Sequence, residues 1–224
     1  MNNAELTAEK LKIIPFPQNV KTGGDFVKIK PFVSSAEGAI GRFLPKSGDV
    51  EVAFSSDENL PPEAYRLKIS LDAVEITASS YAGRLYGAVT LDMIIKQFGD
   101  ALPTLEISDA PLIAHRGTQL SYGQINVEYR GEWLKRHIVE LCKMRINYLY
   151  LYLEFDFAFP SLPPICGKGM MTPSDAKEIT AFAAQYNIKI VPQANFLGHT
   201  ADLLAIQLLN GLKEVDDKTD CAKT

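Results

Sequence analysis

Cysteine is scarce in this sequence of 224 residues, and the three cysteines stand far apart, at positions 142, 166 and 221. An odd number at such a spacing argues against a disulfide framework and against a zinc knuckle. Basic residues are not in excess either, since 23 Lys and Arg stand against 27 Asp and Glu. The chain therefore offers no positive field for nucleic acid, and we expect no nucleic-acid partner.

Long apolar runs are also missing. No stretch approaches the length needed to cross a bilayer, and the opening residues, MNNAELTAEKLK, lack the apolar core of a secretory signal. We expect no membrane partner and a cytoplasmic location. The sequence also shows no cluster of metal ligands and no phosphate-cradling glycine loop, so we expect no metal and no cofactor.

The first part of the sequence predicts a small α+β domain, which we place at residues 1–107. Short apolar or alternating runs predict strands at residues 50–54, 65–70 and 74–78. Apolar residues three and four apart then predict a helix over residues 79–98, which Gly99 would end. Strands followed by one packing helix are typical of an α+β layer. Around residues 102–111 we expect the chain to leave this domain, stiffened by Pro103 and Pro111.

From His115 onward, the pattern predicts alternating strands and helices. We expect strands near residues 117–122, 147–153 and 188–192, and helices at 132–144 and after Thr172. Tyrosine and leucine alternate through residues 147–153, so that strand is expected to be covered on both faces. We assign residues 108–224 to an incomplete (β/α)8 barrel of the TIM type with about three βα units, because a complete barrel takes roughly 250 residues.

Polar side chains follow two of these strands where each strand ends. Glu154 and Asp156 come after the second strand, and Gln193, Asn195 and His199 come after the third. In a barrel the carboxyl ends of the strands share one rim, where active sites lie. An acidic side chain there could orient the imidazole of His199 and raise its basicity.

Several motifs occur along the chain in a fixed order. They are EAYRLKIS and VEITASSYAGRLYGAVTLDMII in the first part, then HRGTQLSYG, KMRINYLYLYLEFDF, TPSDAKEITAFAAQYNIKIVPQ and FLGHT in the second. Their order and spacing resemble glycoside hydrolase family 20, the β-N-acetylhexosaminidases, from about residue 13 to residue 204. In that family a non-catalytic α+β domain precedes the barrel.

The resemblance implies an enzyme that removes terminal N-acetylhexosamine from a carbohydrate by substrate-assisted, retaining hydrolysis. The acetamido oxygen of the sugar attacks the anomeric carbon, so the protein supplies a general acid and a group that orients the acetamide. By motif position, Arg116 would bind sugar hydroxyls and His199 would belong to the network that supports the acid. Either Glu154 or Asp156 would be the partner of His199.

The sequence also departs from the family pattern. Phe155 stands where a carboxylate usually supports the histidine, Gln193 and Asn195 stand at common acidic positions, and Ser121 replaces an aspartate. The adjacent Asp-Glu pair that orients the acetamide and supplies the acid follows the fourth strand in this family. The one such pair here, Asp57–Glu58, lies in the first domain and is better explained as a solvated loop.

Two hypotheses follow. In the first, the chain is a fragment of a hexosaminidase that lacks the Asp-Glu pair and is inactive by itself. In the alternative, it is a non-catalytic or degenerate relative that at most binds sugar, as Phe155, Gln193 and Asn195 would suggest. The gluco or galacto configuration of the substrate, its linkage and the oligomeric state stay open.

Overall fold

The computed structural model describes residues 10–28, 32–33, 38–45, 50–99, 101–121, 131–153, 157–161, 169–194, 204 and 210–212. The chain divides into two compact units. Unit 1 holds Met1–Arg116 with Ile138–Asn147 and Gln185–Asn187, and unit 2 holds Gly117–His137, Tyr148–Ala184 and Ile188–Thr224. Unit 1 therefore includes short stretches that come late in the sequence.

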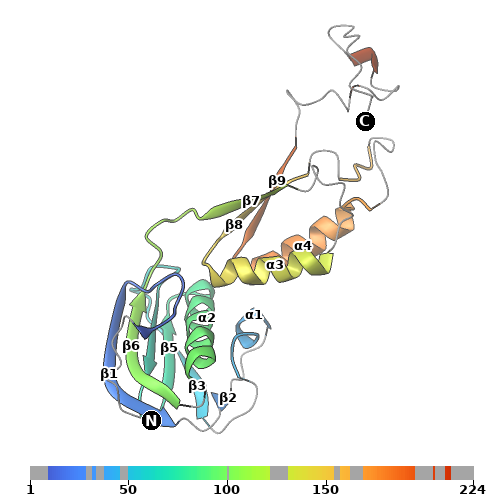
Figure 1. The fold of residues 1–224 in the computed structure, drawn as a ribbon. Helices are drawn as coiled ribbons and strands as arrows, with labels where there is room; N and C mark the ends of the chain where they lie inside the picture. Colours follow the sequence, from blue (N-terminus) through green and yellow to red (C-terminus); the bar gives the residue numbers. More distant parts are fainter. Residues whose placement is uncertain are drawn as a thin grey trace. The chain divides into compact units, whose positions relative to one another are not determined.

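A six-stranded sheet forms the body of unit 1 (Figure 1). In order across the sheet, its strands are β1 (Asn19–Lys28), β6 (Ala101–Asp109), β4 (Tyr65–Ile69), β5 (Val74–Ala78), β3 (Val50–Ser56) and β2 (Phe32–Val33). Pairing is antiparallel from β1 to β5 and parallel from β5 through β3 to β2. The predicted strands β3, β4 and β5 are confirmed. A short helix, α1 (Gly38–Gly41), also belongs to this unit.

Helix α2 (Tyr81–Phe98) packs on one face of this sheet (Figure 1). Residues alternate along β4 between buried and exposed, so a single face of the strand is apolar. The helix begins after Ser80, whose side chain accepts a hydrogen bond from the backbone of Gly83, and it ends at Gly99 with φ 64°. The predicted helix and its stop are confirmed, and the α+β layer fits the prediction.

Two glycines let α2 approach the sheet closely. A Cβ atom on Gly83 would lie 2.2 Å from the carbonyl oxygen of Ala64, and one on Gly87 would lie 2.6 Å from the Ile76 side chain. The Ala64 oxygen is backbone and has little freedom to withdraw. A side chain at residue 83 would therefore push the helix away from the sheet.

Gly83→Ala is expected to lower the free energy of unfolding by about 2 kcal/mol, because it overpacks this contact. In an exposed helix the same change raises the free energy of unfolding by about 1 kcal/mol, because alanine favours the helix more than glycine does. A loss of stability would therefore show that the tight packing outweighs helix propensity. Urea denaturation of the chain and its variant measures the difference. A variant more stable than the parent would contradict the close approach.

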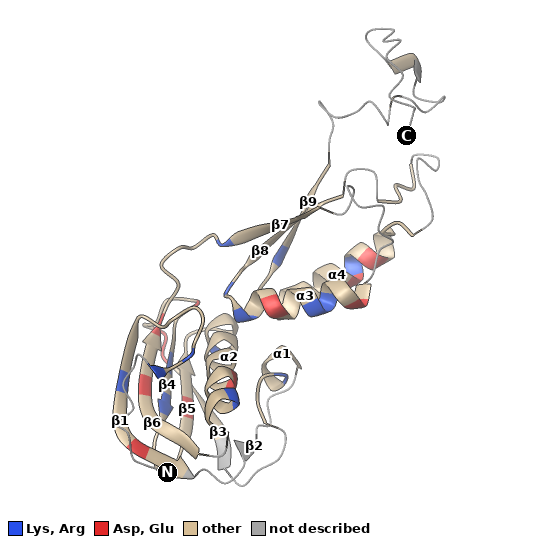
Figure 2. Ribbon diagram, viewed as in Figure 1, with Lys and Arg blue, Asp and Glu red and all other residues tan. Residues whose placement is uncertain are grey.

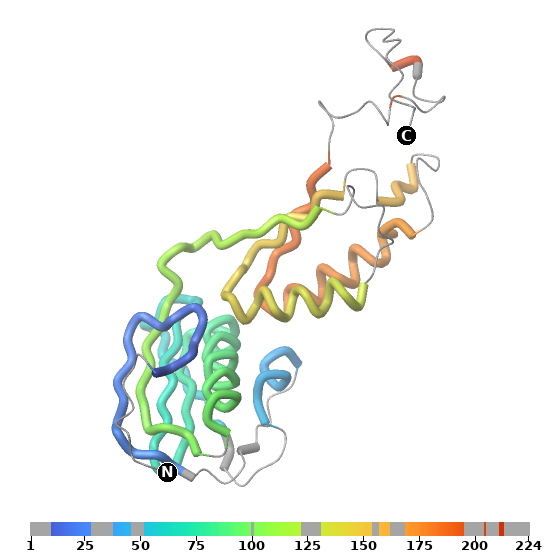
Figure 3. The backbone as a smooth tube through the Cα atoms, viewed as in Figure 1, coloured from blue at the N-terminus to red at the C-terminus, as the bar shows by residue number. Residues whose placement is uncertain are grey.

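Strands β1 and β6 were not predicted, and the expectation that residues 102–111 leave the domain is wrong. Residues Ala101–Asp109 form a strand between β1 and β4, and the predicted division after residue 107 falls inside it. Pro103 was expected to stiffen that passage, but it pairs with Phe26 beside a register shift in β1 between Thr22 and Phe26. The ladder is irregular there, so the missing N–H of proline costs little. Figure 3 shows β1 and β6 running side by side.

Unit 2 contains a parallel sheet in the order β7 (Gly117–Ser121), β8 (Tyr148–Tyr152) and β9 (Lys189–Gln193). The three strands match the predicted ones and are joined through helices, as predicted for βα units. Leu149 and Leu151 are buried, whereas the alternating tyrosines of β8 are half-buried. Of the two faces expected to be covered, the leucine face is buried and the tyrosine face is covered only in part.

Two helices connect these strands, α3 (Gly131–Lys143) and α4 (Pro173–Gln185). Lys135 of α3 forms an ion pair of 2.6 Å with Glu178 of α4, and Figure 2 shows charged residues along both helices. The predicted cap of α4 is confirmed, because the Asp175 amide donates to the Thr172 hydroxyl oxygen at 3.2 Å and the Thr172 amide donates to the Asp175 carboxylate at 2.9 Å. A short 3-10 helix lies at Asn210–Leu212.

Candidate functional site

The carboxyl ends of β8 and β9 lie next to each other in unit 2. The amide of Leu153 donates to the carbonyl of Gln193 at 3.0 Å, which continues the pairing of the two strands. The chain then returns at Phe157, which forms a bridge with Met171. The predicted partners Glu154 and Asp156, and the predicted His199, lie outside the described residues, as do Phe155 and Asn195.

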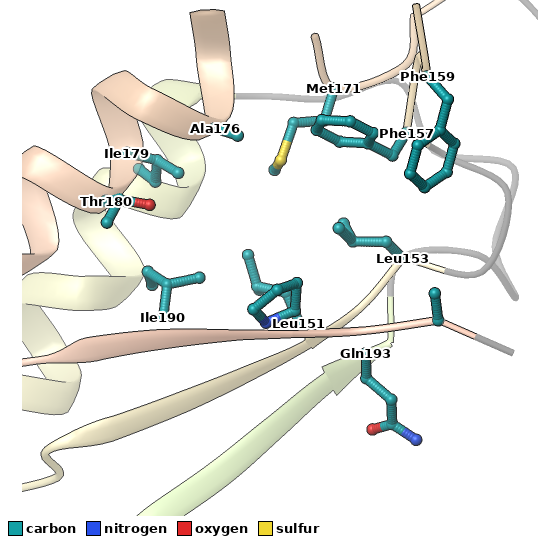
Figure 4. A pocket seen from close by; sticks show the side chains of 12 residues that line it. Leu151, Leu153, Phe157, Phe159, Met171, Ala176, Ile179, Thr180, Ile190 and Gln193 are labelled. Atoms are coloured by element: carbon teal, nitrogen blue, oxygen red, sulfur yellow. The ribbon is translucent and has the colours of Figure 1, made fainter. Parts of the chain in front are cut away.

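An apolar cavity of about 380 Å³ opens between α4 and these strand ends. Its lining includes Leu151, Leu153, Phe157, Met171 and Ile179, and Figure 4 shows these side chains around the opening. The side chain of Gln193 points away from the others in this view. Such a lining offers few groups that could bind sugar hydroxyls, so we regard the cavity as part of the contact between helix and sheet.

The opposite face of the same sheet is polar and aromatic. Residues pair across it in rows, and the row at the carboxyl edge brings together Ser121, Tyr152 and Gln193. Ser121 and Tyr152 are half-buried and Gln193 is exposed. At the other end of this face, the Lys189 ammonium lies 5.4 Å from the centre of the Tyr148 ring.

Two residues of the Ser121–Tyr152–Gln193 row, Ser121 and Gln193, stand at positions where the sequence departs from the family pattern. A hydroxyl, a phenol and an amide can exchange hydrogen bonds with sugar hydroxyls, and a tyrosine ring can stack on a sugar. None of the three carries a carboxyl group. The row therefore offers groups that can bind a saccharide, but it lacks the carboxylic acid that protonates the leaving group in glycoside hydrolysis.

Arg116 immediately precedes β7, and each of its guanidinium nitrogens donates within unit 1. Nη2 donates to the Glu63 carboxylate at 2.8 Å and to the Tyr86 hydroxyl at 3.3 Å. Nη1 donates to the other Glu63 oxygen at 3.2 Å and to the carbonyl of Ile113 at 2.6 Å. Nε donates to the carbonyl of Arg145 at 2.5 Å. The side chain is only 14% exposed.

Glu63 and Arg116 stabilise each other in their charged forms. Burial acts to raise the pKa of Glu63, but the hydrogen bond and charge of Arg116 outweigh it and leave the pKa below its ordinary value. Burial acts to lower the pKa of Arg116, and the bond to Glu63 more than offsets this. Burial raises the pKa of Tyr86 to about 12, so its hydroxyl stays protonated at neutral pH.

The structure thus places Arg116 in a cluster that the sequence did not predict. Glu63, Tyr86 and Asn187 lie within the segments that resemble the family, but no pattern in those segments gave them a role, and they lie far from Arg116 in the sequence. One available signal was Asn187 itself, since asparagine just after a predicted helix favours the left-handed conformation it adopts, with φ 56°. A role for Arg116 in sugar binding stays a prediction, and it would require some of these bonds to be exchanged.

The predicted loop role of Asp57–Glu58 agrees with the structure. Both residues follow β3 in a turn before β4, and the Asp57 carboxylate pairs with Arg66 at 2.9 Å. Its pKa is lowered chiefly by hydrogen bonds from Asn59. In the described part of the chain, no group of His, Cys, Asp and Glu has the arrangement of a metal site, and no helix is long and apolar enough to cross a membrane.

The fold is of the mixed α/β class, because an α+β sheet domain is followed in the chain by parallel βα units. Residues 34–110 match the model of glycosyl hydrolase family 20, domain 2. The chain belongs to glycoside hydrolase family 20.

Several characterised proteins and solved structures resemble the chain. A β-N-acetylhexosaminidase of Cellulomonas fimi is 30% identical over 67% of this chain and 34% of its own length. A lacto-N-biosidase of Bifidobacterium bifidum is 24% identical over 73% of this chain and 14% of its own length. The structure of a family 20 exo-β-N-acetylglucosaminidase from Vibrio harveyi, in complex with N-acetylglucosamine, is similar with a TM-score of 0.76 at 20% identity, covering 96% of this chain and 40% of that one. The chain thus spans less than half the length of these proteins.

Proposed function

We propose that the chain is the amino-terminal part of a β-N-acetylhexosaminidase. Its non-catalytic α+β domain would extend through β6 to Asp109, and the βα units from Gly117 onward would begin a (β/α)8 barrel that hydrolyses terminal N-acetylhexosaminides with retention. The observation that carries the proposal is the parallel order β7, β8, β9 with intervening helices, directly after a domain of family 20. Sheets of this kind place their chemistry at the carboxyl ends of the strands.

The substrate in this proposal is a carbohydrate with a terminal N-acetylhexosamine. Its acetamido oxygen would attack the anomeric carbon, so no protein nucleophile is required. His199, with Glu154 or Asp156 as its partner, would support the general acid from the rim that follows β8 and β9. The Ser121–Tyr152–Gln193 row lies at the same edge of the sheet and supports a saccharide-facing surface there.

The acid itself would come from an adjacent Asp-Glu pair that follows a further strand. The Asp-Glu pair of this sequence, Asp57–Glu58, belongs to the turn after β3 and is held by Arg66 and Asn59, so it does not fit that role. We therefore expect residues 1–224 alone to show no turnover.

The reading frame beyond residue 224 tests the proposal. A further strand ending in adjacent Asp-Glu should follow, and the protein encoded by that frame should release 4-nitrophenol from 4-nitrophenyl N-acetyl-β-D-glucosaminide or its galacto epimer. Residues 1–224 should release none. Turnover by residues 1–224 would refute the role assigned to the pair, and an inactive protein that contains the pair would favour a degenerate, sugar-binding relative.

A further inference from the structure

One carboxylate in unit 1 collects hydrogen bonds from three separate parts of the chain. Oε1 of Glu63 accepts from Arg116 Nη2 at 2.8 Å, from Asn187 Nδ2 at 2.8 Å and from the Tyr86 hydroxyl at 3.1 Å. Asn187 also donates to the Tyr86 hydroxyl oxygen at 2.9 Å. The Glu63 side chain is 23% exposed, so these bonds are largely shielded from water.

Asn147 Nδ2 lies 3.5 Å from the same oxygen, and the three donors other than Tyr86 stand just before the parallel strands. Arg116 precedes β7 by one residue, Asn147 precedes β8 by one, and Asn187 precedes β9 by two. Arg116 and Asn147 are bonded directly: the Asn147 amide donates to the Arg116 carbonyl at 2.9 Å, and the Arg116 amide donates to Asn147 Oδ1 at 2.9 Å. The entries to three strands therefore meet around Glu63.

Two residues at these entries have a backbone conformation that usually favours glycine. Arg145 and Asn187 follow α3 and α4 with φ of 62° and 56°. The arginine guanidinium donates to the Thr90 hydroxyl at 2.6 Å and to the Tyr86 carbonyl at 3.1 Å, and it lies 5.0 Å from the centre of the Tyr86 ring. Side-chain bonds thus hold both unusual turns, which favours these residues over glycine.

We propose that Glu63 is the organising residue of a polar hub, formed with Tyr86, Arg116, Asn147 and Asn187, that fixes the entries into β7, β8 and β9. The hub includes Arg116, the predicted sugar-binding residue, but its role in the fold goes beyond the proposed function. Glu63 lies within residues 34–110, the region that matches the family 20 domain, and its hydrogen bonds come from side chains at residues 116, 147 and 187, outside that region. The stability of the domain therefore depends on these later residues. These contributions explain why late segments of the chain belong to unit 1.

The test compares Glu63→Gln with Glu106→Gln in the 224-residue chain. Glu106 makes an exposed ion pair with Lys68 at 3.3 Å in the same sheet, so it is a matched carboxylate outside the hub. Amide hydrogen exchange at Arg116 and Asn147 should be about tenfold faster or more in the Glu63 variant, because the hub loses a charged acceptor. Exchange in the β4–β5 ladder should change much less, and the Glu106 variant should resemble the parent.

Asn187→Gly provides a second variant that does not depend on the carboxylate. Glycine adopts the positive φ of residue 187 easily, so this change removes the amide contact and keeps the turn. It should also speed exchange at Arg116 and Asn147, and the effects of the two changes should be less than additive in the double variant, because both weaken bonds to the same oxygen of Glu63. Unchanged exchange at these amides, or an equal increase throughout unit 1, would overturn the proposal.

Discussion

Replacing Arg116 by methionine is expected to lower the free energy of unfolding by about 3 kcal/mol. The substitution keeps an apolar stem but removes the guanidinium, which donates to Glu63, to Tyr86 and to the carbonyls of Ile113 and Arg145. A largely buried carboxylate would then keep only the bonds from Tyr86 and the asparagines. Removing one partner of such a pair lowers stability by more than the intact pair adds to it, because the other charge stays buried without a partner.

Arg66→Met is the matched control for this prediction. Arg66 also pairs with a carboxylate, Asp57, at 2.9 Å, but its side chain is 55% exposed. Exposed pairs contribute about 0 to 1 kcal/mol, so this variant should stay within about 1 kcal/mol of the parent. Chemical denaturation of the three proteins measures both differences. Equal losses for Arg116→Met and Arg66→Met would show that the Glu63 pair is no stronger than a surface pair.

The second large effect concerns the substrate. For the protein encoded by the complete frame, replacing the acetamido group of the aryl glycoside by hydroxyl should lower kcat/KM by at least about 10³-fold. In the proposed mechanism the acetamido oxygen is the nucleophile, held beside the anomeric carbon, and such intramolecular groups act at very high effective concentration. A hydroxyl at that carbon has no carbonyl oxygen to attack with.

The comparison uses 4-nitrophenyl N-acetyl-β-D-glucosaminide and 4-nitrophenyl β-D-glucoside under identical conditions. The leaving group is the same in both, so the ratio reports the acetamido group alone. Similar values of kcat/KM for the two would contradict substrate assistance and would require a carboxylate nucleophile from the protein.

Elements with local signals could be predicted from the sequence. The alternation of β4, Gly99 after α2 and the Thr172–Asp175 cap each specify structure within a few residues. Strand β1 offered no such signal, because NVKTGGDFVK is polar and contains two glycines. It becomes a strand through its pairing with β6, a partner distant in the sequence.

The site could be predicted only in part, for the same reason. Arg116 was singled out as a sugar-binding residue by its motif, but the identity of its present partner, Glu63, depends on how α2 and β4 bring distant residues together. Ser121 and Gln193 were noticed separately as departures from a pattern. Only the register of β7, β8 and β9 places them in one row on either side of Tyr152.

The stereochemistry of the released sugar tests the central claim most directly. Proton nuclear magnetic resonance can follow the anomeric signals while the protein encoded by the complete frame hydrolyses a β-N-acetylglucosaminide. Attack by the acetamido oxygen followed by water inverts the anomeric carbon twice, so the β-anomer should appear first and the α-anomer later by mutarotation. Initial release of the α-anomer would contradict the assignment of this chain to a retaining, substrate-assisted hexosaminidase.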